Sequence, residues 1–380
     1  MERAVVRQFI YPALLNPPSS LTFGDQFAFR PTGSTTSAII ALLHTVTHLL
    51  TNNPYVCVIA LDFSKAFDKV RHFTLLEKLA CLDIPDNVFN WLVNFYRDHS
   101  HCTRYGGDMS ALLKITASII QGSAIGPVSY VVTAADLTTT VPGNSLCKYA
   151  DDTYIIVPAS NVDTRSCEVN NVEAWAKANN LTLNCSKSVE IVFTTKRKRQ
   201  FTDPPLLPGI TRVTTLKMLG VTISDKLSVS DHIQNIVSSC AQSVHTIRTL
   251  RAHGMSQEAI QTVFWCVFVA KLTYAANPWW GFATATDRQR VEAVIRWGVR
   301  SGLCHPDILT AAELIEDMDD DLFQQILWDK NHTLHAMLPD RRPTLDYELR
   351  PRSHDRELVP KLNCLIESNF LIRQLYKNCY

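Results

Sequence analysis

The sequence has few of the features that mark a specialised class of protein. Its 11 cysteines are scattered, with no CxxC pair and no Cys/His cluster at zinc spacing, so we expect free thiols in a reducing compartment. It contains no internal repeat, no long low-complexity tract and no charge-free apolar run of about 18 residues, which argues against a membrane span. Its first residues lack the layout of a secretory signal. We therefore expect an intracellular protein of the cytoplasm or nucleus.

A strong overall charge is also missing, because the formal net charge is only +1. The distribution is uneven: residues 1–195 carry 14 Lys and Arg against 16 Asp and Glu, residues 196–300 carry 14 against 6, and residues 301–380 carry 9 against 14. A basic middle segment is typical of a stripe that binds phosphates. It is equally compatible with a solvated face whose arginines pair with acids elsewhere.

What is present is an ordinary globular composition, 46% hydrophobic and 19% charged, in a chain of 380 residues. That length allows two or three domains. Apolar periodicity predicts the following elements in order: a helix at 37–50, a strand at 55–61, helices at 72–82 and 86–98, a turn at 106–107, a helix at 126–140, two strands within 146–157, a helix at 163–180, a strand at 189–194, strands at 216–224 and three helices within 229–303. This order predicts an α+β domain with a small, mostly antiparallel sheet.

Three aspartates stand where this sheet would bring them together. Asp62 ends the first strand, and Asp151 and Asp152 lie at the bend between two strands some 90 residues later. If those strands are neighbours, the carboxylates converge at one edge and can hold two divalent cations for nucleotidyl transfer. Taken singly, each aspartate is better explained as a helix cap, a loop residue or a turn residue. The hypothesis therefore depends on the whole set.

The segments around these aspartates resemble the conserved motifs of reverse transcriptases, in the form found in non-LTR (LINE-type) retrotransposons. The matching segments are FGDQFAFRPTGSTTSAI at 23–39 before motif A, LDFSKAFDKV at 61–70 for motif A, QGSAIGP at 121–127 for motif B, YADD at 149–152 for motif C, LTLNCSKSVEIVF at 181–193 for motif D and LKMLGVTIS at 216–224 for motif E. The resemblance runs from about residue 2 to about residue 300.

This resemblance implies an α+β right-hand polymerase fold, whose palm has an antiparallel sheet and is accompanied by partial fingers and followed by a helical thumb. It places partial fingers and a lead-in helix at 1–60, the palm with motifs A to E at 61–225, the thumb at 226–303 and a C-terminal helical extension at 304–380. It implies an RNA-directed DNA polymerase that uses Mg²⁺, or Mn²⁺ in its place. Its expected partners are an RNA template, a DNA primer and deoxynucleoside triphosphates, with no membrane. The oligomeric state is left open.

The family's catalytic roles carry over to matching positions. Asp62, Asp151 and Asp152 match the metal ligands, and the carbonyl of Phe63 would also face a metal. Phe67 matches the bulky residue that blocks a ribose 2′-hydroxyl, although a core Phe on a helix turn is the alternative interpretation. Lys187 matches a motif D lysine that donates a proton to the leaving pyrophosphate or neutralises it, although a lone Lys in a polar loop is usually only solvated.

Further positions match contacts with the nucleotide and the primer–template duplex. Gln121 and Gly122 match motif B, which contacts the incoming nucleotide and the template, although a simple turn before a helix is the alternative. Tyr149 would line the floor of the nucleotide site. The expected primer–template contacts are Arg30, Lys217, Leu219, Gly220, Arg248 and Arg251, with Lys271, Arg288 and Arg290 as further phosphate contacts. The run KRKR at 196–199 is either a basic loop or a nuclear localisation signal.

The sequence also departs from the family pattern. No RPIS-like segment of the fingers is present, which predicts an N-terminally truncated form of the element's protein. An RNA-dependent RNA polymerase is disfavoured, because Ala150 precedes the paired aspartates and Phe67 occupies the gate. The alternative function is a catalytically inactive RNA- or DNA-binding protein derived from a retroelement and lacking complete fingers.

Overall fold

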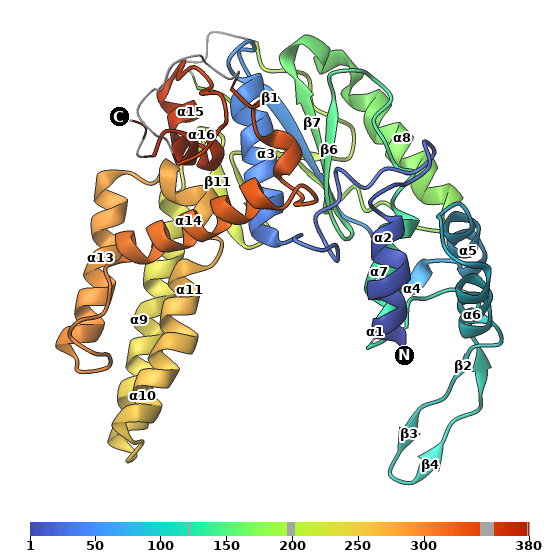
Figure 1. Cartoon of the computed structure of the whole chain (residues 1–380), viewed down its shortest axis with the longest axis horizontal. Helices are drawn as coiled ribbons and strands as arrows, with labels where there is room; N and C mark the ends of the chain where they lie inside the picture. Colours follow the sequence, from blue (N-terminus) through green and yellow to red (C-terminus); the bar gives the residue numbers. More distant parts are fainter. Residues whose placement is uncertain (121, 196–201, 343–352, 378, 380) are drawn as a thin grey trace. The chain divides into compact units, whose positions relative to one another are not determined.

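The computed structural model describes residues 1–120, 122–195, 202–342, 353–377 and 379 (Figure 1). Its contacts divide the chain into two compact units. The first contains 1–34, 57–190 and 203–212, and the second contains 35–56, 191–202 and 213–380. Each unit is described by itself. This division into two units does not test the expected division into fingers, palm, thumb and extension. Those domain boundaries stay a prediction.

The first unit is built on a five-stranded sheet, and the ends of its strands β1, β8 and β9 pass into the second unit. The strand order is β6 (Ser145–Tyr149), β7 (Asp152–Pro158), β1 (Val56–Leu61), β8 (Val189–Phe193) and β9 (Thr211–Val213). β6 and β7 form an antiparallel hairpin that pairs Tyr149 with Asp152. β1 and β7 are buried at nearly every position, as expected of runs rich in Val and Ile. The expected α+β class with antiparallel strands is confirmed.

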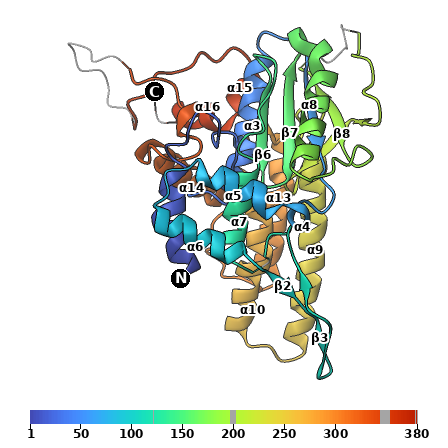
Figure 2. The ribbon, with the colours of Figure 1, turned by 90° about the vertical axis from the view of Figure 1, so that its right-hand side faces the viewer.

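Helices and two small ribbons complete this unit. They are α1 (Glu2–Val5), the π-helix η1 (Val6–Ile10), α2 (Tyr11–Ala13), α4 (Ala66–Lys69), α5 (His72–Ala80), α6 (Asp86–Tyr96), α7 (Ile125–Thr133), the 3₁₀ helix η2 (Ala159–Thr164), α8 (Arg165–Ala178), the pair β2 (Ser100–His101) with β5 (Leu113–Lys114), and the pair β3 (Arg104–Tyr105) with β4 (Asp108–Met109). The predicted turn is present, because Gly106 and Gly107 both have positive φ between β3 and β4. α8 lies along the sheet (Figures 1 and 2), where its Arg165 pairs with the buried Glu190 of β8.

A buried lysine joins the lead-in segment around Asp25–Phe27 to the β6–β7 hairpin at one edge of the sheet. The side chain of Lys148 in β6 is fully buried, and its Nζ lies 3.0 Å from Asp25 Oδ2. The same ammonium donates to the carbonyls of Ala134 at 2.9 Å and Leu137 at 3.0 Å. Two backbone hydrogen bonds connect the same segments. Lys148 N–H donates to the backbone carbonyl of Asp25 at 2.7 Å, and Phe27 N–H donates to the backbone carbonyl of Lys148 at 2.9 Å. Asp25–Phe27 therefore runs beside the end of β6.

These contacts also explain a wrong helix boundary. The sequence predicts a helix from about 126 to 140, but α7 ends at Thr133. The carbonyls of Ala134 and Leu137 turn to the Lys148 ammonium, and the carbonyl of Ala135 accepts from Thr22 N–H at 2.7 Å. Tertiary hydrogen bonds thus replace the last turn that local propensity favours.

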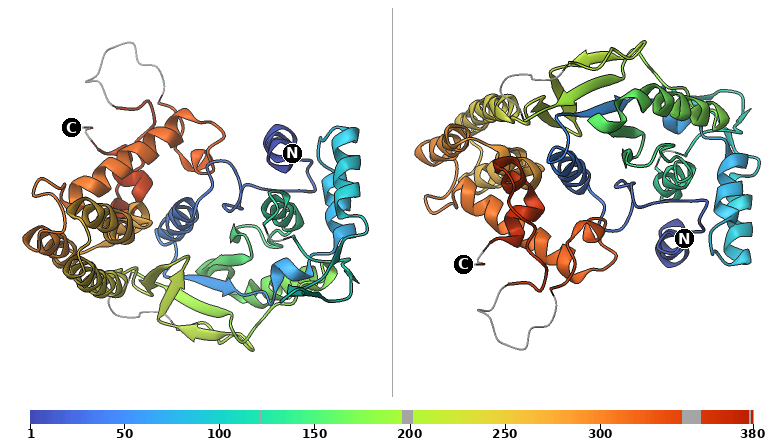
Figure 3. Two further views of the ribbon diagram at one scale, coloured as in Figure 1. Left: turned by 90° about the horizontal axis from the view of Figure 1, so that it is seen from below. Right: turned by 90° about the horizontal axis from the view of Figure 1, so that it is seen from above.

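The second unit is mostly helical. It contains α3 (Thr35–Leu49), the hairpin β10 (Thr215–Met218) with β11 (Val221–Ser224), α9 (Ser230–Ala252), α10 (Gln257–Val263), the π-helix η3 (Phe264–Val269), α11 (Ala270–Thr273), α12 (Ala276–Trp279), the 3₁₀ helix η4 (Trp280–Phe282), α13 (Ala285–Arg300), α14 (Ala311–Trp328), the 3₁₀ helix η5 (His335–Met337), α15 (Cys364–Ser368) and α16 (Phe370–Leu375). Figure 3 shows the helices of residues 230–300, yellow to orange, gathered into a bundle in which α9 packs against α10, η3, α11 and α13. The helical pattern expected over 229–303 is confirmed.

One helical stretch in this bundle, Gln257–Phe282, is long and apolar enough to cross a membrane by length and composition. It carries Glu258 and Lys271, so it is not a charge-free apolar run. Of its most apolar window, 39% is buried inside the structure. Its segments α10, η3 and α11 pack on α9.

The buried pair gives a stability prediction. Lys148→Met leaves the carboxylate of Asp25 buried without its cation, which we expect to lower the free energy of unfolding by about 3–5 kcal/mol. Denaturant titration followed by circular dichroism measures this loss. In the double variant Asp25→Asn/Lys148→Met most of the loss should be recovered, because neither charge remains. An unchanged midpoint in Lys148→Met would show that the pair does not anchor the segment.

Candidate active site

The turn between β6 and β7 holds two of the three predicted aspartates. Ala150 has a φ of 56°, a left-handed conformation that is unusual for a residue other than Gly. Its N–H donates to Oε1 of the buried Gln26 at 3.0 Å, and the same oxygen accepts from Ala28 N–H at 3.0 Å. A side chain from the lead-in segment therefore holds the strained turn that carries Asp151 and Asp152.

The third aspartate lies where β1 ends, and a separate segment fixes its backbone. Asp62 N–H donates to Ser188 Oγ at 3.2 Å, and Asn184 N–H donates to the carbonyl of Asp62 at 2.8 Å. The buried Ser188 hydroxyl in turn donates to the carbonyl of Asn184 at 2.9 Å. Phe63 forms an antiparallel bridge with Leu183. Residues 183–188 thus clamp both sides of the Asp62 peptide.

The three carboxylates influence one another. Burial raises the pKa of Asp152 to about 6, and repulsion by Asp151 and Asp62 adds to the rise. Burial also raises the pKa of Asp151, and Asp62 again contributes. Among the described residues, however, no three His, Cys, Asp or Glu side chains are grouped as a metal site would require. The aspartates are thus close enough to repel, while their side chains do not form a closed ligand cage.

A divalent cation suits this donor set. The oxygens of carboxylates are the ligands that Mg²⁺ and Mn²⁺ prefer, and a cation would offset the repulsion that raises the two pKa values. Residues with such perturbed pKa values in a shared location are typical of functional sites.

An aromatic stack lies beside the carboxylates. The half-buried Phe67 stacks on Tyr130 of α7, with ring centroids 4.6 Å apart and planes at 27°, and Phe29 meets Phe67 edge-on at 6.5 Å. Burial raises the pKa of the Tyr130 hydroxyl, and the charges of Asp151 and Asp152 raise it further. The ring of Phe67 therefore stacks on a residue whose pKa is raised by the charges of the carboxylates.

Three of these supporting residues are not in the sequence prediction: Gln26, Tyr130 and Ser188. Tyr130 has a visible signal, since it is the single aromatic residue of α7, the helix that begins within motif B. Ser188 directly follows the predicted Lys187. Nothing local distinguishes Gln26, because its role depends on the fold bringing it to Ala150.

The remaining predicted residues of the first unit have varied positions. Lys187 is exposed and has no side-chain partner within the described ranges, and Gly122 has a φ of 87°, which favours glycine. Tyr149 ends β6 next to the turn. Arg30 donates to the carbonyls of Phe23 and Gln26, so its guanidinium is engaged within its own loop. Gln121 and the KRKR run at 196–199 lie outside the described residues.

In the second unit, the predicted motif E residues lie on the β10–β11 hairpin. Lys217 is exposed on β10, and Leu219 and Gly220 form the turn with φ of 45° and 90°. Tyr274, which sequence reasoning did not select, donates its hydroxyl to the carbonyl of Leu219 at 3.0 Å. A Cβ at Gly220 would lie 3.0 Å from the Tyr274 ring, so glycine permits this close contact.

The predicted phosphate contacts of the helical bundle also make internal bonds. Arg248 donates to Ser301 Oγ at 2.7 Å and covers the Trp297 ring at 5.3 Å, and Arg251 donates to the Ser301 carbonyl at 2.7 Å. The other predicted contacts also have partners within the chain. Lys271 donates to the Ser243 hydroxyl, Arg288 donates to the Trp280 carbonyl, and Arg290 forms an ion pair with Asp287. These bonds help to hold the bundle together, and contact with nucleic acid stays a prediction.

Comparison with known families decides the assignment. Residues 5–223 match the family model described as "Reverse transcriptase (RNA-dependent DNA polymerase)", a span that includes all three aspartates, motifs A to D and all but the last residue of motif E. The chain belongs to the reverse transcriptase family. The right-hand polymerase fold class expected from the sequence is therefore confirmed, and divalent metal ions are what this family generally uses.

Its relatives are RNA-directed DNA polymerases of non-LTR retrotransposons, as the resemblance implied. It is 26% identical over 352 residues to the probable RNA-directed DNA polymerase from transposon BS of Drosophila melanogaster, covering 89% of this chain and 37% of that protein. It is 26% identical to the enzyme from mobile element jockey of the same species, covering 56% of this chain and 24% of that protein. The chain thus spans well under half the length of these relatives.

A likeness to solved structures is weaker. Apo telomerase from Candida tropicalis aligns over 84% of this chain and 51% of that chain, with 13% identity and a TM-score of 0.46. A TM-score below 0.5 is too low to transfer any feature of that structure. The family assignment depends on the sequence match alone.

The repulsion among the carboxylates gives a second stability prediction. Because the pKa of Asp152 is raised to about 6, the folded protein should gain stability as the pH falls from 7 through 6, where this carboxyl binds a proton. Asp152→Asn should mimic that protonation and raise the melting temperature by about 1–3 °C in EDTA at pH 7.5. Differential scanning calorimetry measures the shift. The matched variant Asp108→Asn, in the exposed β3–β4 ribbon, should show none. A lower melting temperature for Asp152→Asn would contradict the repulsion.

Proposed function

We propose that this chain is an RNA-directed DNA polymerase that extends a primer 3′-hydroxyl by two-metal nucleotidyl transfer. The observation that carries the proposal is the position of the three aspartates in a member of this family: Asp62 directly follows β1, and Asp151 and Asp152 lie at the start of β7, the strand next to β1 in the sheet. Substrates would be an RNA template, a DNA primer and deoxynucleoside triphosphates.

The three aspartates would hold Mg²⁺, or Mn²⁺ in its place, together with the carbonyl of Phe63. Bound cations would supply activation of the attacking hydroxyl and neutralisation of the triphosphate. The protein's own contribution is positional. Gln26 holds the turn of Asp151 and Asp152, and Ser188 with Asn184 holds the backbone of Asp62, so the two halves of the ligand set are fixed from different segments.

Phe67 would select deoxynucleotides by occupying the space that a ribose 2′-hydroxyl needs. The stack on Tyr130 and the edge contact with Phe29 support this role, because they restrict how far the Phe67 ring can move. The backbone of Phe67 is held as well, since its carbonyl accepts from Ile119 N–H at 2.8 Å. A gate that cannot swing aside discriminates better than a mobile one.

Other residues would assist. Lys187 is exposed and free of side-chain partners within the described ranges, which suits a proton donor to pyrophosphate. Gln121, Gly122 and Tyr149 would contact the nucleotide. Leu219 and Gly220, buttressed by Tyr274, would contact the primer, as would Lys217 and the arginines at 248 and 251.

Primer extension on poly(rA)/oligo(dT) with Mg²⁺ or Mn²⁺ tests the proposal. We expect dTTP incorporation by the wild-type chain, and a loss of about 100-fold or more in Asp151→Asn because a metal ligand is removed. Asp108→Asn, which also removes one surface carboxylate, should retain wild-type activity. Duplex binding without incorporation by the wild-type chain, over a range of protein concentrations with either metal, would contradict the proposal and favour a non-catalytic nucleic-acid-binding role.

Phe67 has its own prediction. Phe67→Val should lower the preference for dTTP over UTP by about 100-fold, because the smaller side chain leaves room for the 2′-hydroxyl. Single-nucleotide incorporation with each triphosphate measures the ratio of kcat/KM values. Phe67→Tyr keeps the ring and should keep most of the preference. Equal selectivity in wild type and Phe67→Val would exclude Phe67 as the gate.

A further inference from the structure

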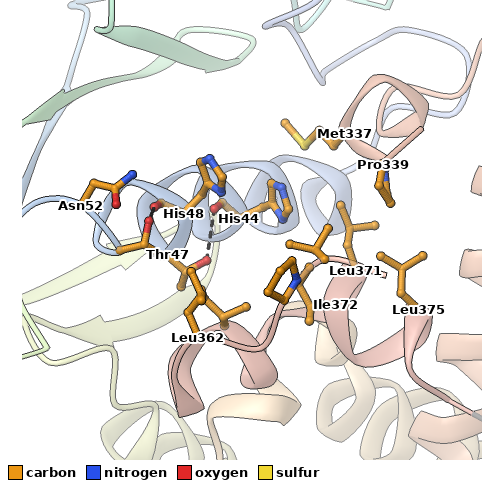
Figure 4. A pocket seen from close by; sticks show the side chains of 14 residues that line it. His44, Thr47, His48, Asn52, Met337, Pro339, Leu362, Leu371, Ile372 and Leu375 are labelled. Carbon is orange, nitrogen blue, oxygen red and sulfur yellow. Dashed lines mark hydrogen bonds between the residues drawn. The ribbon is translucent and has the colours of Figure 1, made fainter. Parts of the chain in front are cut away.

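A cavity lies within the second unit, and none of its lining residues is assigned to polymerisation. It has a volume of about 410 Å³ and is lined by α3, by residues near 337–339 and by the segment 359–375. Figure 4 shows His44 and His48 on α3, with Leu371 and Ile372 across from them. No Lys, Arg, Asp or Glu is among its lining residues. The lining therefore favours an uncharged occupant.

Hydrogen bonds with Thr47, which lines the cavity, and with Leu371 fix the orientation of the Asn369 side-chain amide. The buried Thr47 donates its hydroxyl to the carbonyl of Leu43 at 2.8 Å, so its Oγ1 can accept from another group. Nδ2 of the buried Asn369 donates to that oxygen at 3.3 Å. Oδ1 of Asn369 accepts from Leu371 N–H at 3.1 Å, as the N-cap of α16. Both contacts assign the same amide orientation.

This orientation fixes the state of His44. Its Nδ1 lies 3.3 Å from Asn369 Oδ1, which can only accept, so Nδ1 carries the proton. Burial lowers the pKa of His44, so the ring is neutral at pH 7. Nε2 is then left with a lone pair, and it has no hydrogen-bond partner in the described part of the chain. The cavity wall thus offers an acceptor to a donor that enters the cavity.

We propose that this cavity binds a small, uncharged aromatic molecule whose N–H or O–H donates to Nε2 of His44. The volume falls within the range of about 300–1,000 Å³ that is usual for small-molecule sites. Flat surfaces are available, because the His44 and His48 rings are nearly parallel, with an interplanar angle of 10°. Met337 adds a polarisable sulfur that favours aromatic rings. The site does not depend on the proposed polymerase activity.

A matched pair of probes tests the proposal on the full chain. 1-Naphthol has the hydroxyl donor, whereas 1-methoxynaphthalene has nearly the same shape without it. By isothermal titration at pH 7.5 we expect 1-naphthol to bind about tenfold more tightly. Equal affinities, or no saturable binding of 1-naphthol, would overturn the proposal.

Variants locate the binding. His44→Phe keeps a ring but removes the acceptor, so it should abolish the difference between the probes while circular dichroism remains native. The control His48→Phe changes the exposed neighbour and should preserve the difference. If His44→Phe does not fold, Leu362→Glu provides the test, because Leu362 lines the cavity yet is 69% exposed. It should weaken both probes, and unchanged binding of both in Leu362→Glu would overturn the proposed location.

Discussion

The turn that carries Asp151 and Asp152, the proposed metal ligands, depends on one buried ion pair. Lys148 and Asp25 attach the lead-in segment to the end of β6, and this attachment brings the amide oxygen of Gln26 to the N–H of Ala150. A left-handed alanine followed by two repelling carboxylates is an unfavourable arrangement in isolation. Burying the pair is itself costly, which is acceptable only because the ammonium also reaches two carbonyls. Burial of the ion pair therefore costs free energy of folding, and the pair fixes the conformation of the turn.

Tertiary contacts also fix Asp62, the third proposed metal ligand. Asp62 ends a fully packed strand, but its peptide is fixed by Ser188 and Asn184, which follow more than 120 residues later in the chain. Buried hydroxyl and amide groups satisfy one another there, so the backbone has little freedom. Tyr130 connects a third segment, helix α7, to the site. Its ring stacks on Phe67, and the charges of Asp151 and Asp152 act on its hydroxyl. A site assembled from distant segments is thus held mainly by polar and aromatic contacts.

Much of this could be predicted from the sequence, for reasons that are local. Apolar runs specify β1 and β7, Gly106 and Gly107 specify a turn, and the motif order places Asp62 and the Asp151–Asp152 pair. What could not be predicted depends on tertiary contacts. Lys148 lies in an apolar strand and therefore needs a partner, but only the fold identifies it as Asp25. The early end of α7 has the same origin. The hydrogen bonds of Arg248 and Arg251 to Ser301 also depend on tertiary contacts and could not be predicted from the sequence.

Asp62, Asp151 and Asp152 are proposed to form one site for divalent cations. Electron paramagnetic resonance of Mn²⁺ tests it directly, because the signal of free Mn²⁺ falls when the ion binds. The wild-type chain should bind Mn²⁺ at neutral pH, and the binding should be lost in Asp62→Asn and in Asp151→Asn alike, although these residues come from different segments. The same amount of Mn²⁺ bound by the wild type and by both variants would contradict the account.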